Sequence, residues 1–183
     1  MKPPPEERRA LDHAIPTMLT AHEIIGFMSP ALSAEILEEL HAKEKPFYRS
    51  IMTAVAEARK VRPVFFERKA RVERNKDIIE TLSKPRMEVT ALGLLQTWLL
   101  KSQAALLADF LNAVGIQHQN GAVEDIPETM PDDKLWPAVE GLLAKHPHEK
   151  VAVYLRAFND LNDAKWPNLA EILDKDARLQ LCG

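Results

Sequence analysis

The chain has 183 residues, which is enough for one domain with a full hydrophobic core. Its net charge of −3 is too small to indicate a nucleic-acid or membrane partner by itself. The single cysteine, Cys182, excludes an intrachain disulfide, and one free thiol fits a reducing compartment. We therefore expect a cytoplasmic protein.

The composition favours helices, because Ala, Leu, Glu and Lys are abundant and only six glycines are present. No run of alternating β-branched residues is typical of a strand. The nearest one, residues 149–155, continues smoothly into a helical pattern. These features predict an all-α fold, a single-domain bundle of about six to seven helices.

The N-terminal residues are predicted to form an extended arm. Pro3, Pro4 and Pro5 disfavour a helix there, and acidic residues stand where a signal peptide would have an apolar stretch. We expect an arm over residues 1–15 and a helical domain over residues 16–183. A weak division of that domain into residues 16–86 and 87–183 is also expected.

The first helices are predicted from their capping residues. Thr20 and Glu23 have the spacing of a capping box, so the first helix, within 16–28, should begin at residue 21. Ser29 followed by Pro30 is typical of an N-cap and a first helical residue, which predicts a second helix to about residue 43. A third helix is expected over about 46–61.

A fourth helix is predicted over residues 63–82, with Pro63 as a kink or a new start. Phe65, Val72 and Ile79 recur every seven residues, while the turns between them are almost wholly charged. Such a helix should bury one narrow apolar seam and expose the rest of its surface.

Residues 89–114 form the longest apolar run and are predicted to be one buried central helix around which the bundle packs. Gly115 should end this helix in the left-handed conformation, with Ile116 packing back on its last turn. A membrane span is not expected, because Lys101 would lie near mid-bilayer.

A long irregular stretch, residues 117–131, follows the apolar run, and helices are expected after it over 132–145, 149–161 and 168–179. Trp136 and Trp166 each precede a proline near a helix start, so both should pack on the core.

A basic segment is the first candidate for function. Its cationic residues are Arg59, Lys60, Arg62, Arg68, Lys69, Arg71, Arg74 and Lys76. Clustered Arg and Lys favour phosphate binding to nucleic acid. A solvated helix face is the alternative, since Glu67 and Arg71 are spaced as a helical ion pair. The segment could also dock on the acidic C-terminal half, within one chain or across a dimer.

The loop after the apolar run is the second candidate, as a binding or catalytic pocket. The residues that could line it are His118, Glu124, Asp125, Asp132 and Trp98. Their spacing matches no metal motif, so no metal ligand set is predicted. The alternatives are structural: His118 could cap a turn, and Asp132 or Asp133 could be the N-cap of the next helix.

Three functions follow from these patterns. The sequence has no Gly-x-Ser-x-Gly elbow and no Gly-rich phosphate loop, so no cofactor is predicted and enzymatic activity is left open. The first hypothesis is a non-catalytic protein-interaction or homo-oligomeric module. The alternatives are a small-ligand-binding protein or enzyme with a pocket beside residues 117–133, and nucleic-acid binding through residues 59–76. No membrane partner is expected.

Overall fold

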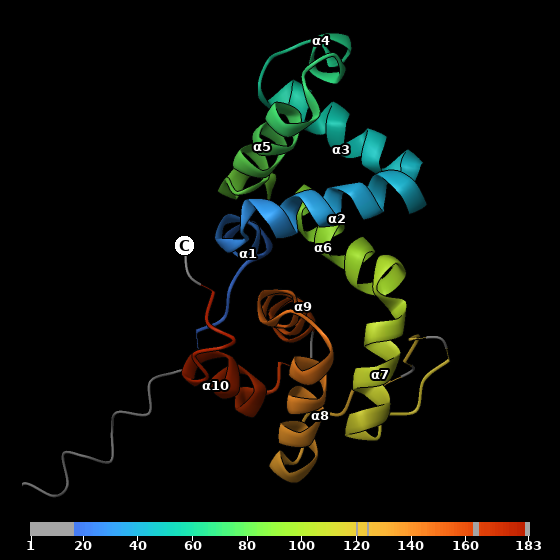
Figure 1. The fold of residues 1–183 in the computed structure, drawn as a ribbon, viewed down its shortest axis with the longest axis vertical. Coiled ribbons are helices and arrows are strands. Elements are labelled where there is room, and N and C mark those ends of the chain that lie inside the picture. Colours follow the sequence, from blue (N-terminus) through green and yellow to red (C-terminus); the bar gives the residue numbers. More distant parts are fainter. Residues whose placement is uncertain (1–16, 120, 124, 163–164, 182–183) are drawn as a thin grey trace, which may run out of the picture.

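The computed structural model describes residues 17–119, 121–123, 125–162 and 165–181. Within these ranges the chain forms ten α-helices, one 3-10 helix and one π-helical segment (Figure 1). The same ranges contain no strand, and the bridge between Gln119 and Ala122 only closes a turn. The prediction of an all-α fold is confirmed, with more and shorter helices than expected. None of the helices described has both the length and the hydropathy needed to cross a bilayer.

The helical elements in chain order are α1 (Ala21–Phe27), α2 (Pro30–Lys43), α3 (Lys45–Ala58), α4 (Pro63–Glu67), α5 (Arg71–Leu82), η2 (Pro85–Met87), α6 (Glu88–Thr97), η3 (Trp98–Ser102), α7 (Ala104–Val114), α8 (Asp132–Lys145), α9 (His148–Asp160) and α10 (Pro167–Lys175).

Helix ends that depend on local chemistry lie where the sequence predicts them. The Thr20 backbone N–H donates to Glu23 Oε2 at 2.8 Å, and α1 begins at residue 21. Ser29 Oγ accepts from the Leu32 N–H at 3.2 Å, with Pro30 as the first residue of α2. Gly115 has φ +77° and ends α7.

The prediction of one buried central helix over residues 89–114 is wrong. The run is divided into α6, η3 and α7, because the Trp98 carbonyl accepts from the Gln103 N–H at 2.9 Å, five residues on instead of four. Val89 and Leu100 are 84% and 53% exposed, so the run is not enclosed on all sides either.

The break brings Trp98 and Gln103 to the same carboxylate. The indole N–H of Trp98 and the side-chain amide of Gln103 donate to Glu39 Oε2 of α2 at 3.2 and 2.7 Å. A buried indole needs a hydrogen-bond acceptor, and Glu39 supplies it. This contact between residues distant in sequence occurs together with the π-helical segment. The apolar pattern of residues 89–114 gives no indication of it.

The single helix predicted over residues 63–82 is also two helices. Ala70 is extended (φ −54°, ψ 141°), so the chain leaves α4 and begins α5 anew at Arg71. The break changes which side of the chain faces the core. Phe66 and Ile78 are fully buried, whereas Phe65 and Val72, expected in the apolar seam, are 55% and 82% exposed.

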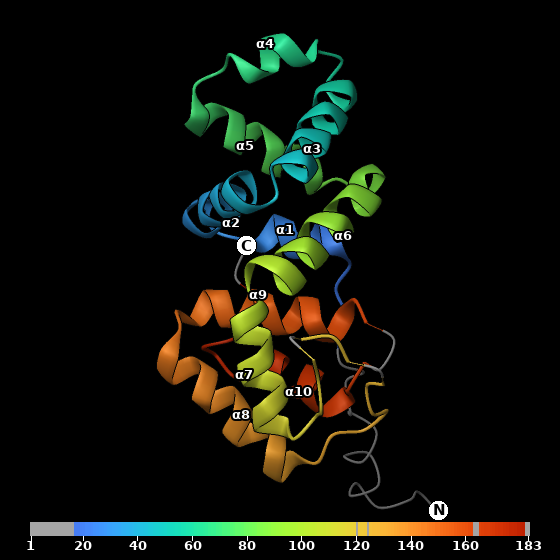
Figure 2. The same cartoon turned by 90° about the vertical axis from the view of Figure 1, so that its right-hand side faces the viewer.

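Helix α9 is the most enclosed helix of the described chain. Every residue from Val151 to Asp160 is buried, and α9 packs against α1, α8, α10 and η3 (Figure 2). Its buried polar residues hold the start of the described chain. Arg156 donates to the Thr17 carbonyl at 2.7 Å, and Asp160 accepts from the Leu19 N–H at 2.9 Å.

The prediction for 132–145 is confirmed by α8, but that for Trp136 is wrong. Trp136 is 43% exposed, whereas Trp166 is fully buried and donates to the Pro127 carbonyl at 2.7 Å. The predicted arm, residues 1–15, lies outside the described residues. The division into residues 16–86 and 87–183 stays a prediction.

Candidate functional site

His118 stabilises the turn at the start of the loop. Its Nδ1 accepts from the Gly121 N–H at 3.1 Å, which leaves the Nε2–H to donate to Asn112 Oδ1 at 3.1 Å. Both ring nitrogens are therefore engaged in holding the turn, as the structural alternative for this histidine proposed. In this geometry neither nitrogen is available for a ligand.

Of the other loop candidates that the structure describes, only Asp125 lies at the same open hollow as His118. Asp132 accepts from the Asn168 side chain at 2.7 Å, and Glu124 lies outside the described residues. Asp132 is the first residue of α8 and Pro131 is the N-cap, which corrects the expected capping role. Trp98 is fully buried and contacts Tyr154 edge-on, with ring centroids 5.8 Å apart. Over the described ranges, no three His, Cys, Asp or Glu residues are grouped to hold a metal ion.

An apolar cavity of about 340 Å³ does lie beside the loop. It is lined mainly by leucines of α6, η3 and α7, by Phe158 of α9, and by Val123 and Ile126 of the loop. Of the candidate residues that the structure describes, His118, Asp125, Asp132 and Trp98, none lines this cavity.

Part of the basic segment is neutralised by carboxylates of α5 and α2. Asp77 accepts ion pairs from Arg59 at 2.9 Å and from Lys69 at 2.5 Å. Arg71 pairs with Glu38 of α2 at 3.2 Å, and not with Glu67 as the helical spacing suggested, because the break at Ala70 removes that spacing. These pairs occupy three of the predicted cations.

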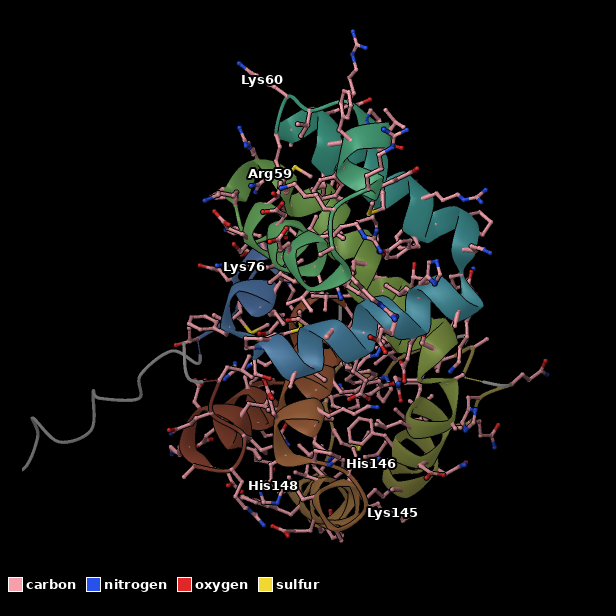
Figure 3. The ribbon with its side chains drawn as sticks, turned by 45° about the horizontal axis from the view of Figure 1, so that its top comes forward. Arg59, Lys60, Lys76, Lys145, His146 and His148 are labelled. Atoms are coloured by element: carbon pink, nitrogen blue, oxygen red, sulfur yellow. The ribbon has the colours of Figure 1, made fainter. Side chains whose placement is uncertain are left out.

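Arg74 is engaged as well, because its Nη1 donates to the Glu67 carbonyl at 2.7 Å and so ties α5 to α4. Four cations remain that form no ion pair with the residues that the structure describes: Lys60, Arg62, Arg68 and Lys76. In Figure 3, Lys60 points outward from the end of the molecule that α4 forms, while Lys76 lies further along α5.

Three of these cations, Lys60, Arg62 and Arg68, lie in the same segment as several exposed apolar side chains. We define the α4 tip as the exposed residues Lys60, Val61, Arg62, Val64, Phe65, Arg68 and Val72. Phe66 is the buried residue that anchors α4 to the core, and this anchoring turns its neighbours Val64 and Phe65 to the outside. Exposed apolar residues close together in the chain make the α4 tip a candidate contact surface.

A second surface of opposite charge lies on α8. Asp132, Asp133 and Trp136 are all exposed, and their spacing of three and four residues puts them on one face of the helix. We define these three residues as the α8 edge. In Figures 1 and 2, α4 and α8 lie at opposite ends of the long axis of the molecule.

The apolar members of both surfaces were missed by sequence reasoning. Phe65 and Val72 were expected in a buried seam, and Trp136 was expected on the core. The signal available in the sequence was the sharp local change of charge, since Arg68, Lys69 and Arg71 leave no apolar position between Phe66 and Val72 except Ala70. That gap favours a break over a continuous helix.

Comparison with protein-family models, with curated proteins and with solved structures finds no match to this chain. The function is therefore inferred from three features of the chain itself: the α4 tip, the α8 edge and the apolar cavity.

Proposed function

We propose that the protein is a non-catalytic interaction module that self-associates head to tail, with the α4 tip of one copy on the α8 edge of the next. The single observation that carries the proposal is the complementarity of these surfaces. Each combines exposed apolar side chains with charges, and the charges are cationic at the tip and anionic at the edge.

The apolar side chains supply the centre of the contact. Phe65 is flanked by Val61 and Val64, and Trp136 is the exposed aromatic residue of the edge. Aromatic residues surrounded by charged groups are typical of the residues that contribute most to binding at protein interfaces. Burying them against one another removes apolar surface that the single copy leaves in water.

The charges select the partner and the orientation. Arg62 and Arg68 form no ion pair with the residues that the structure describes, so an acidic surface of another copy would supply partners for them. Asp132 and Asp133 offer two carboxylates one turn before Trp136. Such pairs at an interface steer association and weaken when salt screens them.

Nucleic-acid binding is the weaker alternative, because Arg59, Lys69 and Arg71 are paired with carboxylates and Arg74 is bound to a backbone carbonyl. Each phosphate contact contributes a slope of about −0.9 to the salt dependence of binding to duplex DNA, and only a few free cations remain here. A single exposed aromatic residue, Phe65, also offers little surface for base stacking.

The positions of the two surfaces favour contacts between copies over contacts within one copy, since tip and edge lie at opposite ends of the molecule (Figures 1 and 2). A contact between two different surfaces is heterologous, and unless the rotation closes a ring it forms open chains. A contact of this limited size should be weak and transient. The proposal assumes the cytoplasmic setting that the single cysteine predicts.

Sedimentation velocity over a series of protein concentrations, at low and at high salt, tests the proposal. We expect the average mass to rise with concentration without stopping at a dimer, and to fall as salt is added. Arg62→Glu/Arg68→Glu should abolish the rise. The matched control is Lys45→Glu/Arg49→Glu, which makes the same charge change at exposed residues of α3.

A strictly monomeric wild-type protein at the highest concentration would overturn self-association. Equal loss of association in the α3 control would show that net charge matters and the tip does not, which also contradicts the proposal.

A further inference from the structure

The apolar cavity beside the loop is a direct consequence of the break in the apolar run. At η3 the chain changes direction, so α6 and α7 diverge instead of continuing as one helix (Figure 2). The resulting space is lined by Leu95 of α6 and Leu99 of η3, by Leu107 and Leu111 of α7, and by Phe158 of α9. Single-turn π-helical insertions occur frequently at functional sites.

The loop is built to cover this space. Gly121 has φ +85°, and a Cβ at this position would lie 3.0 Å from Leu107 Cδ2, so only glycine lets the backbone approach α7 so closely. The hydrogen bond from the Gly121 N–H to His118 holds that approach. The turn thereby carries Val123 and Ile126 to the edge of the cavity.

We propose that this cavity binds a small, neutral, apolar molecule. Its volume of about 340 Å³ falls in the range of small-molecule sites, which is roughly 300–1,000 Å³. No Asp, Glu, Lys, Arg or His is among the described residues that line it. A charged ligand would lose its hydration there without gaining a counter-charge, so the lining selects against ions.

The polar groups at the cavity define the rest of the ligand class. The side chain of Gln96 is an amide, which interacts with a neutral hydrogen-bonding group such as a hydroxyl or a carbonyl. The amide of Asn162 also lies at the cavity, but it already donates to the Phe158 carbonyl and accepts from the Lys165 N–H. The ligand is therefore a hydrocarbon-like molecule with at most one or two neutral polar groups. This inference is independent of the proposed self-association, because the cavity shares no residue with the α4 tip or the α8 edge.

A matched pair of fluorescent probes tests the inference on the full chain. N-phenyl-1-naphthylamine is neutral and apolar, and 8-anilino-1-naphthalenesulfonate has the same rings with one added sulfonate. We expect saturable binding of the neutral probe, one molecule per chain, with a blue-shifted emission. The sulfonated probe should bind at least about tenfold more weakly, because the lining offers no cation.

Two substitutions fill the cavity from different sides. Ala157→Phe acts from α9, where Ala157 is buried, and Ala122→Phe acts at the exposed edge of the loop, where the fold has no packing to lose. The control is Ala144→Phe, an exposed alanine of α8 that does not line the cavity. Both filling variants should weaken binding of the neutral probe by about tenfold or more, and the control should not.

Absence of saturable binding to the wild-type protein would overturn the inference. So would neutral-probe affinity that is unchanged in Ala122→Phe, because the probe would then be bound elsewhere, for example on the exposed side chain of Phe65. Equal affinity for both probes would contradict the selection against charge. Thermal unfolding followed by circular dichroism confirms that each variant is folded before its affinity is compared.

Discussion

Arg156 of α9 should be essential for stability in a way that depends on pH. Its guanidinium side chain is 6% exposed, lies 3.6 Å from Asp160 Oδ2, and also pairs with Asp174. Burial raises the pKa of Asp160, and the hydrogen bond from Leu19 and the charge of Arg156 only partly oppose that effect. Arg156→Met therefore leaves a fully buried carboxylate without its cation.

The expected loss of unfolding free energy at pH 7 is about 3–5 kcal/mol, as for other buried ion pairs that lose one partner. Protonation of Asp160 limits the loss. A carboxyl group whose pKa is raised by folding destabilises the folded state while it is ionised, and this destabilisation is relieved as pH falls. The deficit of the variant relative to wild type should therefore shrink between pH 7 and pH 5, by at most about 1.4 kcal/mol per pH unit.

Urea unfolding of Arg156→Met and wild type at both pH values measures this difference. Arg156→Met/Asp160→Asn should lose most of the pH dependence, because the amide has no charge to neutralise. Arg178→Met is the matched control, since Arg178 also contacts two carboxylates, Glu140 and Asp176, but at the surface. A loss in Arg156→Met that is no larger than in Arg178→Met, or that is the same at both pH values, would refute the reasoning.

Three further variants test the local chemistry. Ser29→Ala removes the N-cap of α2 and the 2.7 Å hydrogen bond to Glu149, and should lower the unfolding free energy by about 1–2 kcal/mol; an unchanged urea midpoint would contradict the capping role. Gly115→Ala puts a Cβ on a residue at φ +77° and should cost about 1–2 kcal/mol at an unchanged urea m-value. Burial acts to raise the pKa of Glu88, but hydrogen bonds from His22 and Ala21 outweigh it and lower the pKa below the ordinary 4.5. The stability advantage of wild type over Glu88→Gln should therefore be present at neutral pH and decrease as pH falls below 4.5; thermal melts at several pH values that show no narrowing would exclude it.

Helix ends were predictable because their causes are local. Thr20 with Glu23, Ser29 with Pro30, and Gly115 each act through atoms a few residues away, and the structure contains all three as expected. Such signals do not depend on how the helices later pack.

The breaks inside the long runs were not predictable from apolar periodicity. The π-helical turn at Trp98 coincides with hydrogen bonds to Glu39, which is 59 residues earlier in the chain. Similarly, the seven-residue repeat of Phe65, Val72 and Ile79 assumes a continuous helix, and the extended conformation of Ala70 ends that continuity. A repeat predicts a buried seam only where the backbone remains helical between its members.

The prediction of which helix is most enclosed was wrong for a related reason, because it too depends on contacts between residues distant in sequence. The run over 89–114 is the most apolar stretch, but α9 is the helix buried on every side from Val151 to Asp160. Arg156, Asn159 and Asp160 of α9 are polar residues that are buried, with partners in the chain start and the C-terminal segment. Partners distant in sequence can make polar residues suitable for burial, and periodicity alone does not detect this.

The candidate sites were predictable only in part. A pocket beside the loop was a hypothesis from the sequence, but the apolar cavity there is lined by residues that the divergence of α6 and α7 brings together, and by none of the described candidate residues. The basic segment is charged, as its sequence shows, but Asp77 and Glu38 pair with three of its cations. The exposure of the apolar residues of the α4 tip depends on the break at Ala70. That exposure was visible only in the three-dimensional structure.

A charge-exchange experiment tests the head-to-tail contact most directly. One variant carries Arg62→Glu/Arg68→Glu in the α4 tip, and the other carries Asp132→Lys/Asp133→Lys in the α8 edge. The edge substitutions should be tolerated, since each carboxylate in the first turn of a helix contributes only about 0.3–1 kcal/mol. Thermal melts check that both variants fold.

Each variant alone should sediment as a monomer, because tip and edge then carry the same sign. In the mixture both contacts are complementary again: the acidic tip meets the basic edge, and the native tip meets the native edge. Sedimentation velocity of the equimolar mixture should therefore recover the concentration-dependent increase in mass of the wild type. A mixture that stays monomeric, while the wild type associates, would contradict the contact between α4 tip and α8 edge.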